Sequence, residues 1–488
     1  MTTPSGKGYQ FDEPLLFELS REGRTGFSFP ASKKPLREPP KSLLRRQEAR
    51  LPEISEPEVI RHFTRLSQWN FSIDTNFYPL GSCTMKYNPR VNEEVVRYTG
   101  FAHVHPYQPT ETTQGCLELL FNLEKYLAEI AGMDAVTLQP AAGAHGELTG
   151  ILIIRAYLES KGNPRKKILI PDSAHGTNPA TSSMVGYEVV QIRTGKEGHL
   201  PVSVVEQAMT EDVAGIMLTN PNTLGLFETE IREIAEVVHA KGGLVYGDGA
   251  NMNALMGKAQ PGDLGIDVLQ YNLHKTFTTP HGGGGPGAGP VAVKKILEPF
   301  LPIPRIARDK EGMFHLEFNR PQSIGRVKAF YGNFGMLIRA YTYIREMGPD
   351  ALKRATELAV LNANYIRARL QDDYHIPFDH GTMHEAVFSD KKQKEFGIST
   401  LDIAKRLMDY GFAPPTIYFP LVVHGALMIE PTETESKETL DNFCDAMIAI
   451  AKEAKENPDL LHKAPHQTKL RRLDEAKAAR ELKLRYTF

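Results

Sequence analysis

A lysine and an aspartate stand just beyond two apolar runs of this sequence. Asp248 directly follows Leu244–Gly247, and Lys275 comes shortly after Val268–Tyr271. A lysine amine can hold an aldehyde as an imine, and a carboxylate can keep a pyridine nitrogen protonated so that the ring accepts electrons. The pair predicts pyridoxal 5'-phosphate (PLP) held as a Schiff base on Lys275. From these residues alone the alternative stays open that Asp248 caps a turn and Lys275 faces solvent.

A run of small residues precedes a helix-prone stretch and is a candidate phosphate site. Ala142, Gly143 and Ala144 lie just before Glu147–Leu158. A helix N-terminus offers free backbone N–H groups and the positive end of a dipole, which suits a phosphate. The alternative is a plain tight turn, because glycine-rich turns before helices are common.

His175 is a candidate for stacking on a flat cofactor. It lies in a loop directly after the apolar run Lys167–Pro171, at the same kind of position as Asp248 and Lys275. The alternative is a histidine that is only hydrogen-bonded within its loop.

Other motifs are weaker. Gly282, Gly284 and Gly287 match G-x-G-x-x-G, but they follow the lysine instead of opening a helix after a first strand, so we reject a dinucleotide site there and expect flexible or tightly packed backbone near the cofactor. There is no G-x-x-x-x-G-K-[ST] motif, which disfavours nucleotide hydrolysis. His103 and His105 lack a third ligand, so no metal site is expected. Cys83 has no assignable partner and is expected in a structural or substrate-side loop.

Alternating strands and helices must position these residues. Short apolar runs predict buried strands at Lys167–Pro171, Tyr187–Ile192, Gly215–Thr219, Leu244–Gly247 and Val268–Tyr271. Helical patterns precede or separate them at Leu117–Ala131, Gly146–Lys161, Val202–Met209 and Glu230–Lys241. This order predicts an α/β fold with a mostly parallel sheet, whose ligands bind at the carboxyl ends of the strands.

The length of 488 residues predicts more than one domain. We expect an N-terminal arm over 1–80, with a helix at Glu58–Trp69, and a large cofactor-binding domain over 81–330. A smaller C-terminal α+β domain over 331–460 contains a long helix at Pro349–Asp372, and a charged tail spans 461–488.

Composition narrows the function classes. A net charge of -2 gives no electrostatic case for binding nucleic acid or a membrane surface. The three cysteines are far apart and odd in number, which favours a reducing compartment over a disulfide framework. The first residues lack a signal or transit pattern, and no run approaches a membrane span, so a cytoplasmic protein is expected.

The sequence resembles the glycine decarboxylase P-protein of the glycine cleavage system over nearly its whole length. The resemblance is carried by NFYPLGSCTMKYNP (76–89), HPYQP (105–109), LQPAAGAHGELTG (138–150), DSAHGTNPA (172–180), YGDGANMNA (246–254), NLHKTFTTPHGGGGPGAGP (272–290) and the region of APPTIYFP (413–420). At this length the chain is similar to subunit 2 of the two-subunit form, which corresponds to the C-terminal half of the long P-protein. The resemblance implies fold type I of the PLP-dependent transferases and an assembly of two copies of this chain with two of subunit 1, the N-terminal half.

The resemblance also implies roles for individual residues. Lys275 is the PLP lysine, Asp248 the pyridinium partner and His175 the stacking residue, whereas the phosphate lies near Ala142, Gly143 and Ala144. His274 and Thr276 flank the lysine and are expected to contact cofactor or substrate.

The implied reaction is the decarboxylation of glycine. Glycine displaces Lys275 and loses carbon dioxide, and its aminomethyl group passes to the lipoyl arm of the H-protein. His175 and His281 are both open as acid or base in the second step, and Arg326 is expected in a structural salt bridge. Two rivals remain: another PLP enzyme of this fold, such as an amino-acid decarboxylase or cysteine desulfurase, and a non-catalytic scaffold subunit.

Overall fold

The computed structural model describes residues 13–486 except 29, 32, 36 and 282–286. The chain divides into two compact units, Met1–Ser72 and Ile73–Phe488. The glycine run at 282–286, for which we predicted flexible or tightly packed backbone, lies outside the described residues. Among the described residues, no helix is long and apolar enough to cross a membrane.

The first unit contains little regular structure. Its described elements are α1 (Leu16–Leu19), η1 (Lys41–Leu43) and α2 (Glu56–Ser67). A capping box between Ser55 and Glu58 begins α2, which confirms the helix predicted in this region. Glu13 joins α2 to the preceding chain, because its carboxylate contacts both His62 and Arg65.

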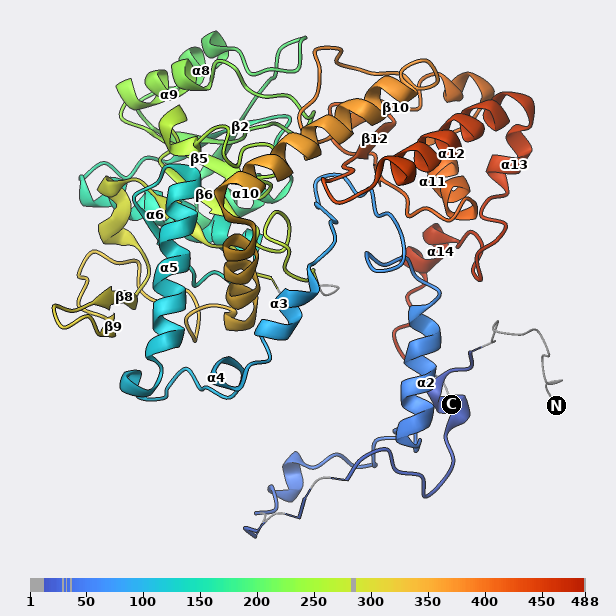
Figure 1. Cartoon of the computed structure of the whole chain (residues 1–488), viewed down its shortest axis with the longest axis horizontal. Coiled ribbons are helices and arrows are strands. Elements are labelled where there is room, and N and C mark those ends of the chain that lie inside the picture. Colours follow the sequence, from blue (N-terminus) through green and yellow to red (C-terminus); the bar gives the residue numbers. More distant parts are fainter. Residues whose placement is uncertain (1–12, 29, 32, 36, 282–286, 487–488) are drawn as a thin grey trace. The chain divides into compact units, whose positions relative to one another are not determined.

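A seven-stranded sheet forms the centre of the second unit (Figure 1). Its order is β1-β7-β6-β5-β4-β2-β3, and β3, β2, β4, β5 and β6 run parallel, whereas β7 runs antiparallel to both of its neighbours. The strands are β1 (Ala135–Thr137), β2 (Lys167–Pro171), β3 (Glu188–Ile192), β4 (Val213–Thr219), β5 (Leu244–Gly249), β6 (Val268–Tyr271) and β7 (Val291–Val293). The predicted mostly parallel sheet is therefore confirmed.

Helices cover both faces of this sheet. Alternate residues of β2 show the division, since Ile168 and Ile170 pack in one apolar core and Leu169 in another. The first core also contains α6 (Gly143–Ser160) and α7 (Thr177–Val185). The second contains residues of α5 (Gln114–Ala131), α8 (Val202–Ala208), α9 (Ile231–Ala240) and the first part of α10 (Phe334–Leu370).

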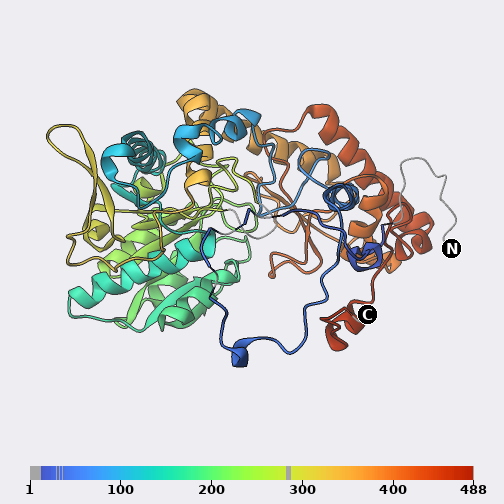
Figure 2. The same cartoon turned by 90° about the horizontal axis from the view of Figure 1, so that it is seen from below.

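A smaller antiparallel sheet follows in the sequence. Its order is β10-β12-β11, with β10 at Ala386–Ser389, β11 at Thr416–Ile417 and β12 at Ala426–Ile429. The second part of α10 packs on it together with α11 (Thr400–Asp409), α12 (Lys437–Glu456) and α13 (Pro458–His462). In Figure 2 the red helices lie on the right of the view and the green elements of the main sheet on the left. Gly348 interrupts α10 with a left-handed φ of 62°, so the second part begins at Pro349, as predicted.

The remaining elements are short. They comprise α3 (Arg90–Val95), α4 (Thr99–Ala102), η2 (Thr110–Thr112), η3 (Pro261–Leu264), η4 (Lys295–Phe300), the hairpin β8 (Arg305–Arg308) and β9 (Phe314–Glu317), η5 (Gln393–Phe396) and α14 (Glu475–Arg480).

Candidate active site

A cavity of about 210 Å³ opens at the carboxyl ends of the main-sheet strands. Asp248 reaches it from the end of β5, and Lys275 from the turn that follows β6. The two strands are neighbours, with Asp248 paired in register with Gln270 of β6. The structure therefore brings the predicted carboxylate and amine to one cavity.

Asp248 is buried and accepts three hydrogen bonds. The amide of Asn178 donates to Oδ2 at 3.2 Å, whereas Gln270 Nε2 and the Ala250 N–H donate to Oδ1 at 2.6 and 3.0 Å. These donors come from α7, β6 and the residue just after β5, so the carboxylate is fixed from several directions. A carboxylate held in this way is preorganised to accept one further hydrogen bond from a ligand.

Glu147 is a second acid at the cavity. It lies in the second turn of α6 and accepts hydrogen bonds from Thr177 Oγ1 at 2.8 Å and Asn178 Nδ2 at 3.0 Å. Burial, followed by the neighbouring charge of Asp248, raises its pKa to about 7. Glu147 was not predicted as a site residue, because nothing local in the sequence shows that it faces Asp248.

Lys275 lies among imidazoles that cannot hold a charge easily. Burial, then the nearby His281 and Lys275, lowers the pKa of His274 to about 3. Burial and the ammonium of Lys275 lower the pKa of His281 to about 4. The two rings meet edge to face with centroids 5.2 Å apart. Both histidines are therefore neutral at pH 7.

His175 lines the cavity together with Asp248 and Lys275. Its Nδ1 contacts Thr177 Oγ1 at 2.8 Å and accepts the Thr177 N–H at 3.2 Å, which fixes the plane of the ring. Burial lowers its pKa, an effect that Asp248 opposes and Lys275 reinforces. A neutral imidazole with a fixed plane is suited to stacking on an aromatic ligand.

The N-terminus of α6 supplies the predicted phosphate end of the site. Ala142 is the N-cap residue, and Gly143 and Ala144 line the cavity. A Cβ at Gly143 would lie 2.4 Å from Asn272 Oδ1, so only glycine allows this approach of the helix to the loop after β6. The amide N–H groups of a first helical turn have no acceptor within the helix and remain available to an anion.

Thr276 lies elsewhere. Its hydroxyl accepts the Met252 N–H at 2.9 Å and it is absent from the residues that line the cavity. It joins the loops that follow β5 and β6, and thereby holds the residues on either side of it.

The weaker candidates also have defined positions. His105 Nδ1 accepts the Tyr107 N–H at 3.1 Å, which is a local turn contact. Arg326 lies over the ring of Phe318, with its guanidinium carbon 5.3 Å from the centroid. The salt bridge predicted for Arg326 is not found among the described residues, so an aromatic contact takes its place.

The segment GSCTMK at 81–86 lies against the small sheet and closes one side of the cavity. Gly81 donates to the Met428 carbonyl, and a Cβ at Gly81 would lie 2.2 Å from Met428 Cγ. Ser82 and Thr84 both adopt left-handed backbone, with φ of 66° and 46°. Ser82 lines the cavity, and burial raises the pKa of the neighbouring Cys83 thiol. The thiol is therefore a weak nucleophile.

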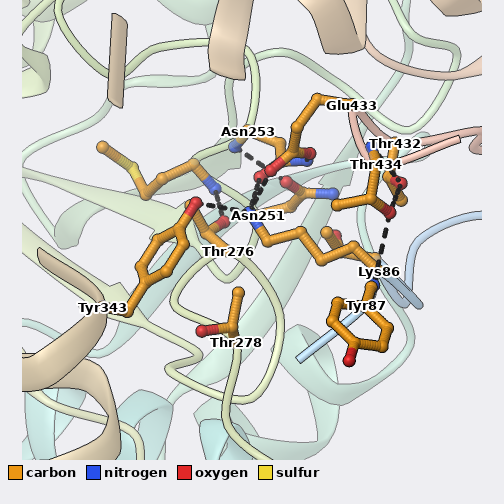
Figure 3. A network of polar contacts seen from close by, with 12 residues as sticks. Lys86, Tyr87, Asn251, Asn253, Thr276, Thr278, Tyr343, Thr432, Glu433 and Thr434 are labelled. Carbon is orange, nitrogen blue, oxygen red and sulfur yellow. Dashed lines mark hydrogen bonds and ion pairs between the residues drawn. The ribbon is translucent and has the colours of Figure 1, made fainter. Parts of the chain in front are cut away.

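The same segment ends in a buried ion pair that ties the two sheets together. Lys86 Nζ lies 2.7 Å from Glu433 Oε1 and also donates to Asn253 Oδ1 and Tyr343 Oη, as Figure 3 shows. The lysine side chain is completely buried. Asn253 follows β5 and Glu433 follows β12, so the network fixes the small sheet beside the cavity.

Sequence reasoning missed three residues of the small sheet. His384 and Glu385 directly precede β10, and Glu430 directly follows β12. His384 and Glu385 line the cavity, and the ligand-capable atoms of all three lie within 4.8 Å of one another. The rule that placed Asp248 at the end of an apolar run would also have found Glu430 after Ala426–Ile429.

Two family models match parts of the chain, and named proteins match nearly all of it. Residues 147–298 match the model "Aminotransferase class-V", and residues 355–470 match "Glycine dehydrogenase, C-terminal domain". A protein of Listeria innocua named probable glycine dehydrogenase (decarboxylating) subunit 2 is 58% identical over 97% of this chain and 98% of its own length. A protein of the same name from Caldanaerobacter subterraneus is 57% identical, with the same coverage of both chains.

Solved structures show the same fold at lower identity. A crystal structure of glycine decarboxylase (P-protein) of the glycine cleavage system, in inhibitor-bound form, has a TM-score of 0.71 at 22% identity and covers 84% of this chain and 93% of its own. A glutamate decarboxylase from Lactobacillus brevis has a TM-score of 0.65 at 13% identity, covering 85% and 96%. The fold is thus fold type I of the PLP-dependent enzymes.

Proposed function

The chain belongs to the family of glycine dehydrogenase (decarboxylating) subunit 2, and from that premise we propose that it decarboxylates glycine with PLP bound to Lys275. One observation supports the proposal most directly: Asp248 and Lys275, at the ends of neighbouring strands, line the same cavity. The aminomethyl group that remains passes to the lipoyl arm of the H-protein, and carbon dioxide is released.

The residues at the cavity fit PLP. The first turn of α6, at Ala142, Gly143 and Ala144, offers N–H groups to a phosphate. Asn272 Oδ1 and His274 Nδ1, both of residues that line the cavity, are buried polar atoms without partners among the described residues. Unpaired buried polar atoms are costly and mark places where a polar ligand completes the hydrogen bonding.

Each residue has a distinct task toward the bound group. PLP supplies an electron sink for the pair of electrons that glycine retains when its carboxylate leaves. Asp248 would hold the protonated ring nitrogen, while Asn178, Gln270 and the Ala250 N–H hold the carboxylate in position. His175 would hold the ring by stacking, and Lys275 would provide the amine that binds the cofactor. Thr276 acts only through the loop that it holds.

The name subunit 2 in the relatives implies a partner chain, subunit 1. We propose that subunit 1 helps to close the cavity and that the assembly contains two copies of each chain, with glycine and the lipoylated H-protein as substrates. The test is to assay this chain alone and with subunit 1, with glycine and lipoylated H-protein. Carbon dioxide release that needs both subunits supports the proposal, whereas full activity of this chain alone contradicts the dependence on a partner.

The assay also separates the rival functions. Another PLP enzyme of this fold would act on a different amino acid and leave glycine unchanged. A scaffold subunit would show no visible cofactor absorbance, and Lys275→Ala would not alter its spectrum. A visible band that Lys275→Ala abolishes, together with glycine-dependent release of carbon dioxide, excludes both.

A further inference from the structure

Two buried carboxyl groups of the small sheet meet beside the cavity. Glu385 precedes β10 and Glu430 follows β12, and a carboxylate oxygen of each lies within 4.8 Å of the other. Glu385 is 4% exposed and Glu430 is fully buried. Two carboxylates this close cannot both remain ionised without a large cost, so the pair shares one proton.

The surrounding donors decide which member holds the proton. Glu430 accepts three hydrogen bonds, from Thr84 N at 3.0 Å, Thr84 Oγ1 at 2.6 Å and Asn251 Nδ2 at 2.8 Å. Glu385 accepts one, from the Ser82 N–H. Hydrogen bonds to a carboxylate stabilise its charge, and Glu385 accepts fewer of them, so Glu385 is the member that carries the proton. Burial and then Glu430 raise the pKa of Glu385 well above its usual range, against the opposing effect of the Lys275 ammonium.

The acid borders the cavity that contains the Lys275 amine. Glu385 lines the same cavity as Lys275, whereas Glu430 is absent from the cavity lining. Atoms that replace the Lys275 amine during a reaction therefore lie within the cavity that Glu385 borders. The other titratable groups that interact with Glu385 are Glu430, Lys275, Cys83 and His384.

His384 provides independent support for a ligand at this point. It is 2% exposed and lines the cavity, yet neither of its ring nitrogens has a hydrogen-bond partner among the described residues. Burial lowers its pKa, so the ring is neutral at pH 7. A metal ion fits this point less well than a polar substrate does, because donors already occupy the oxygens of Glu430.

The reaction of the proposed function needs an acid at one step. When the α-carbon of glycine, having lost carbon dioxide, forms a bond with one sulfur of the lipoyl disulfide, the sulfur–sulfur bond breaks. The second sulfur leaves with the electron pair of that bond and takes one proton. The disulfide is reduced by two electrons, which come from the broken carbon–carbon bond of glycine. The step consumes one proton from the acid, and solvent then supplies a new proton to the acid.

We propose that Glu385, sharing its proton with Glu430, is the catalytic acid that protonates the departing sulfur of the acceptor disulfide. This inference rests on the proposed function. It assigns the second step to a carboxyl group of the small sheet, in place of His175 or His281. The Ser82 N–H positions the acid, and the 81–86 segment is the element through which both carboxyl groups are held.

The first test compares variants of the two-subunit enzyme reconstituted with PLP and lipoylated H-protein. Glu385→Gln keeps a side chain of the same shape but has no proton to give. We expect the affinity for glycine, measured from the spectral change of the cofactor, to stay within about twofold of the unaltered enzyme. The rate of aminomethyl transfer should fall about 10²- to 10⁴-fold. Formate should restore part of the rate to Glu385→Ala by supplying a small acid. Glu395→Gln, at an exposed acid of the same sheet region, is the matched control.

The second test needs neither cofactor nor activity. The infrared carbonyl stretch of protonated carboxyl groups should be present at pH 7 in the protein without PLP. Glu147 contributes to this band, and Glu385→Gln should remove a separate component of it. The inference is overturned if that band is unaffected by Glu385→Gln, or if the variant transfers the aminomethyl group at the normal rate. If the unaltered enzyme does not decarboxylate glycine at all, the proposed function fails, while the infrared band still reports on the shared proton.

Discussion

Glu147 and Asp248 are held by the same amide group. Asn178 Nδ2 donates to Glu147 Oε2 at 3.0 Å and to Asp248 Oδ2 at 3.2 Å. The helix that begins at the proposed phosphate site is thereby connected to the strand that carries the proposed partner of the ring nitrogen. A substitution of Glu147, Asn178 or Asp248 is therefore expected to alter the position of the other two side chains.

Replacing Asp248 with Asn tests the role of the carboxylate. The amide has one acceptor where the carboxylate has two, and it cannot keep a ring nitrogen protonated. Losing a charged hydrogen bond of about 1.5–3 kcal/mol predicts a fall of at least about 10- to 100-fold in decarboxylation. The visible absorbance from the link to Lys275 should persist. A variant with normal kcat would contradict the assignment of Asp248.

Glu147 predicts a specific dependence of stability on pH. Its folded pKa of about 7 lies above the ordinary 4.5, so the folded chain binds this proton more tightly than the unfolded chain does. The associated stability is present below pH 4.5 and is lost as the pH rises to about 7. The total is on the order of 3 kcal/mol.

Glu147→Gln isolates this contribution. We expect the difference in unfolding free energy between the variant and the unaltered protein, both without PLP, to move in favour of Gln as the pH rises through that window. Urea denaturation at each pH measures it. A difference that does not change with pH would show that folding leaves the pKa of Glu147 unchanged.

The Lys86–Glu433 pair predicts a stability loss that a second mutation relieves. Lys86→Met leaves the Glu433 carboxylate buried without its cation, which costs about 3–5 kcal/mol. Lys86→Met combined with Glu433→Gln should cost clearly less than the sum of the single changes. Lys463→Met, at the exposed pair with Asp459, is the control and should cost under about 1 kcal/mol. Additive losses at Lys86 and Glu433 would mean that the two charges do not interact.

His175 can be tested with two substitutions that differ in one property. His175→Phe keeps a flat ring but loses the contacts with Thr177, whereas His175→Ala loses both. If stacking is the main role, the affinity for PLP falls much more in the Ala variant than in the Phe variant. Equal losses, measured by titration of the visible band, would assign His175 to the Thr177 contact instead.

The main sheet was predictable because its strands are buried on both faces. Lys167–Pro171 and Val268–Tyr271 form strands with the expected bounds, since a short continuous apolar run between helical stretches is typical of a central parallel strand. The strands β1 and β7 were not predicted. Each has three residues, too few for a periodic pattern, and their pairing joins segments far apart in the chain.

The site also contains residues that could be predicted from the sequence and residues that could not. Asp248, Lys275 and His175 could be found because each follows a strong strand signal. The sequence could not identify Glu147, His384 and Glu385 as site residues, because their roles depend on neighbours contributed by other elements. Glu385 acts together with Glu430 only because β10 and β12 pair, and no local pattern encodes that contact.

The central claim is that the cofactor is attached to Lys275. Borohydride reduction of the PLP-loaded enzyme makes an imine permanent, and peptide mass spectrometry then locates the added mass. The account predicts the pyridoxyl group on the peptide that contains Lys275, and no label after Lys275→Ala. Label on a different lysine, or a loaded enzyme that borohydride leaves unlabelled, would contradict it.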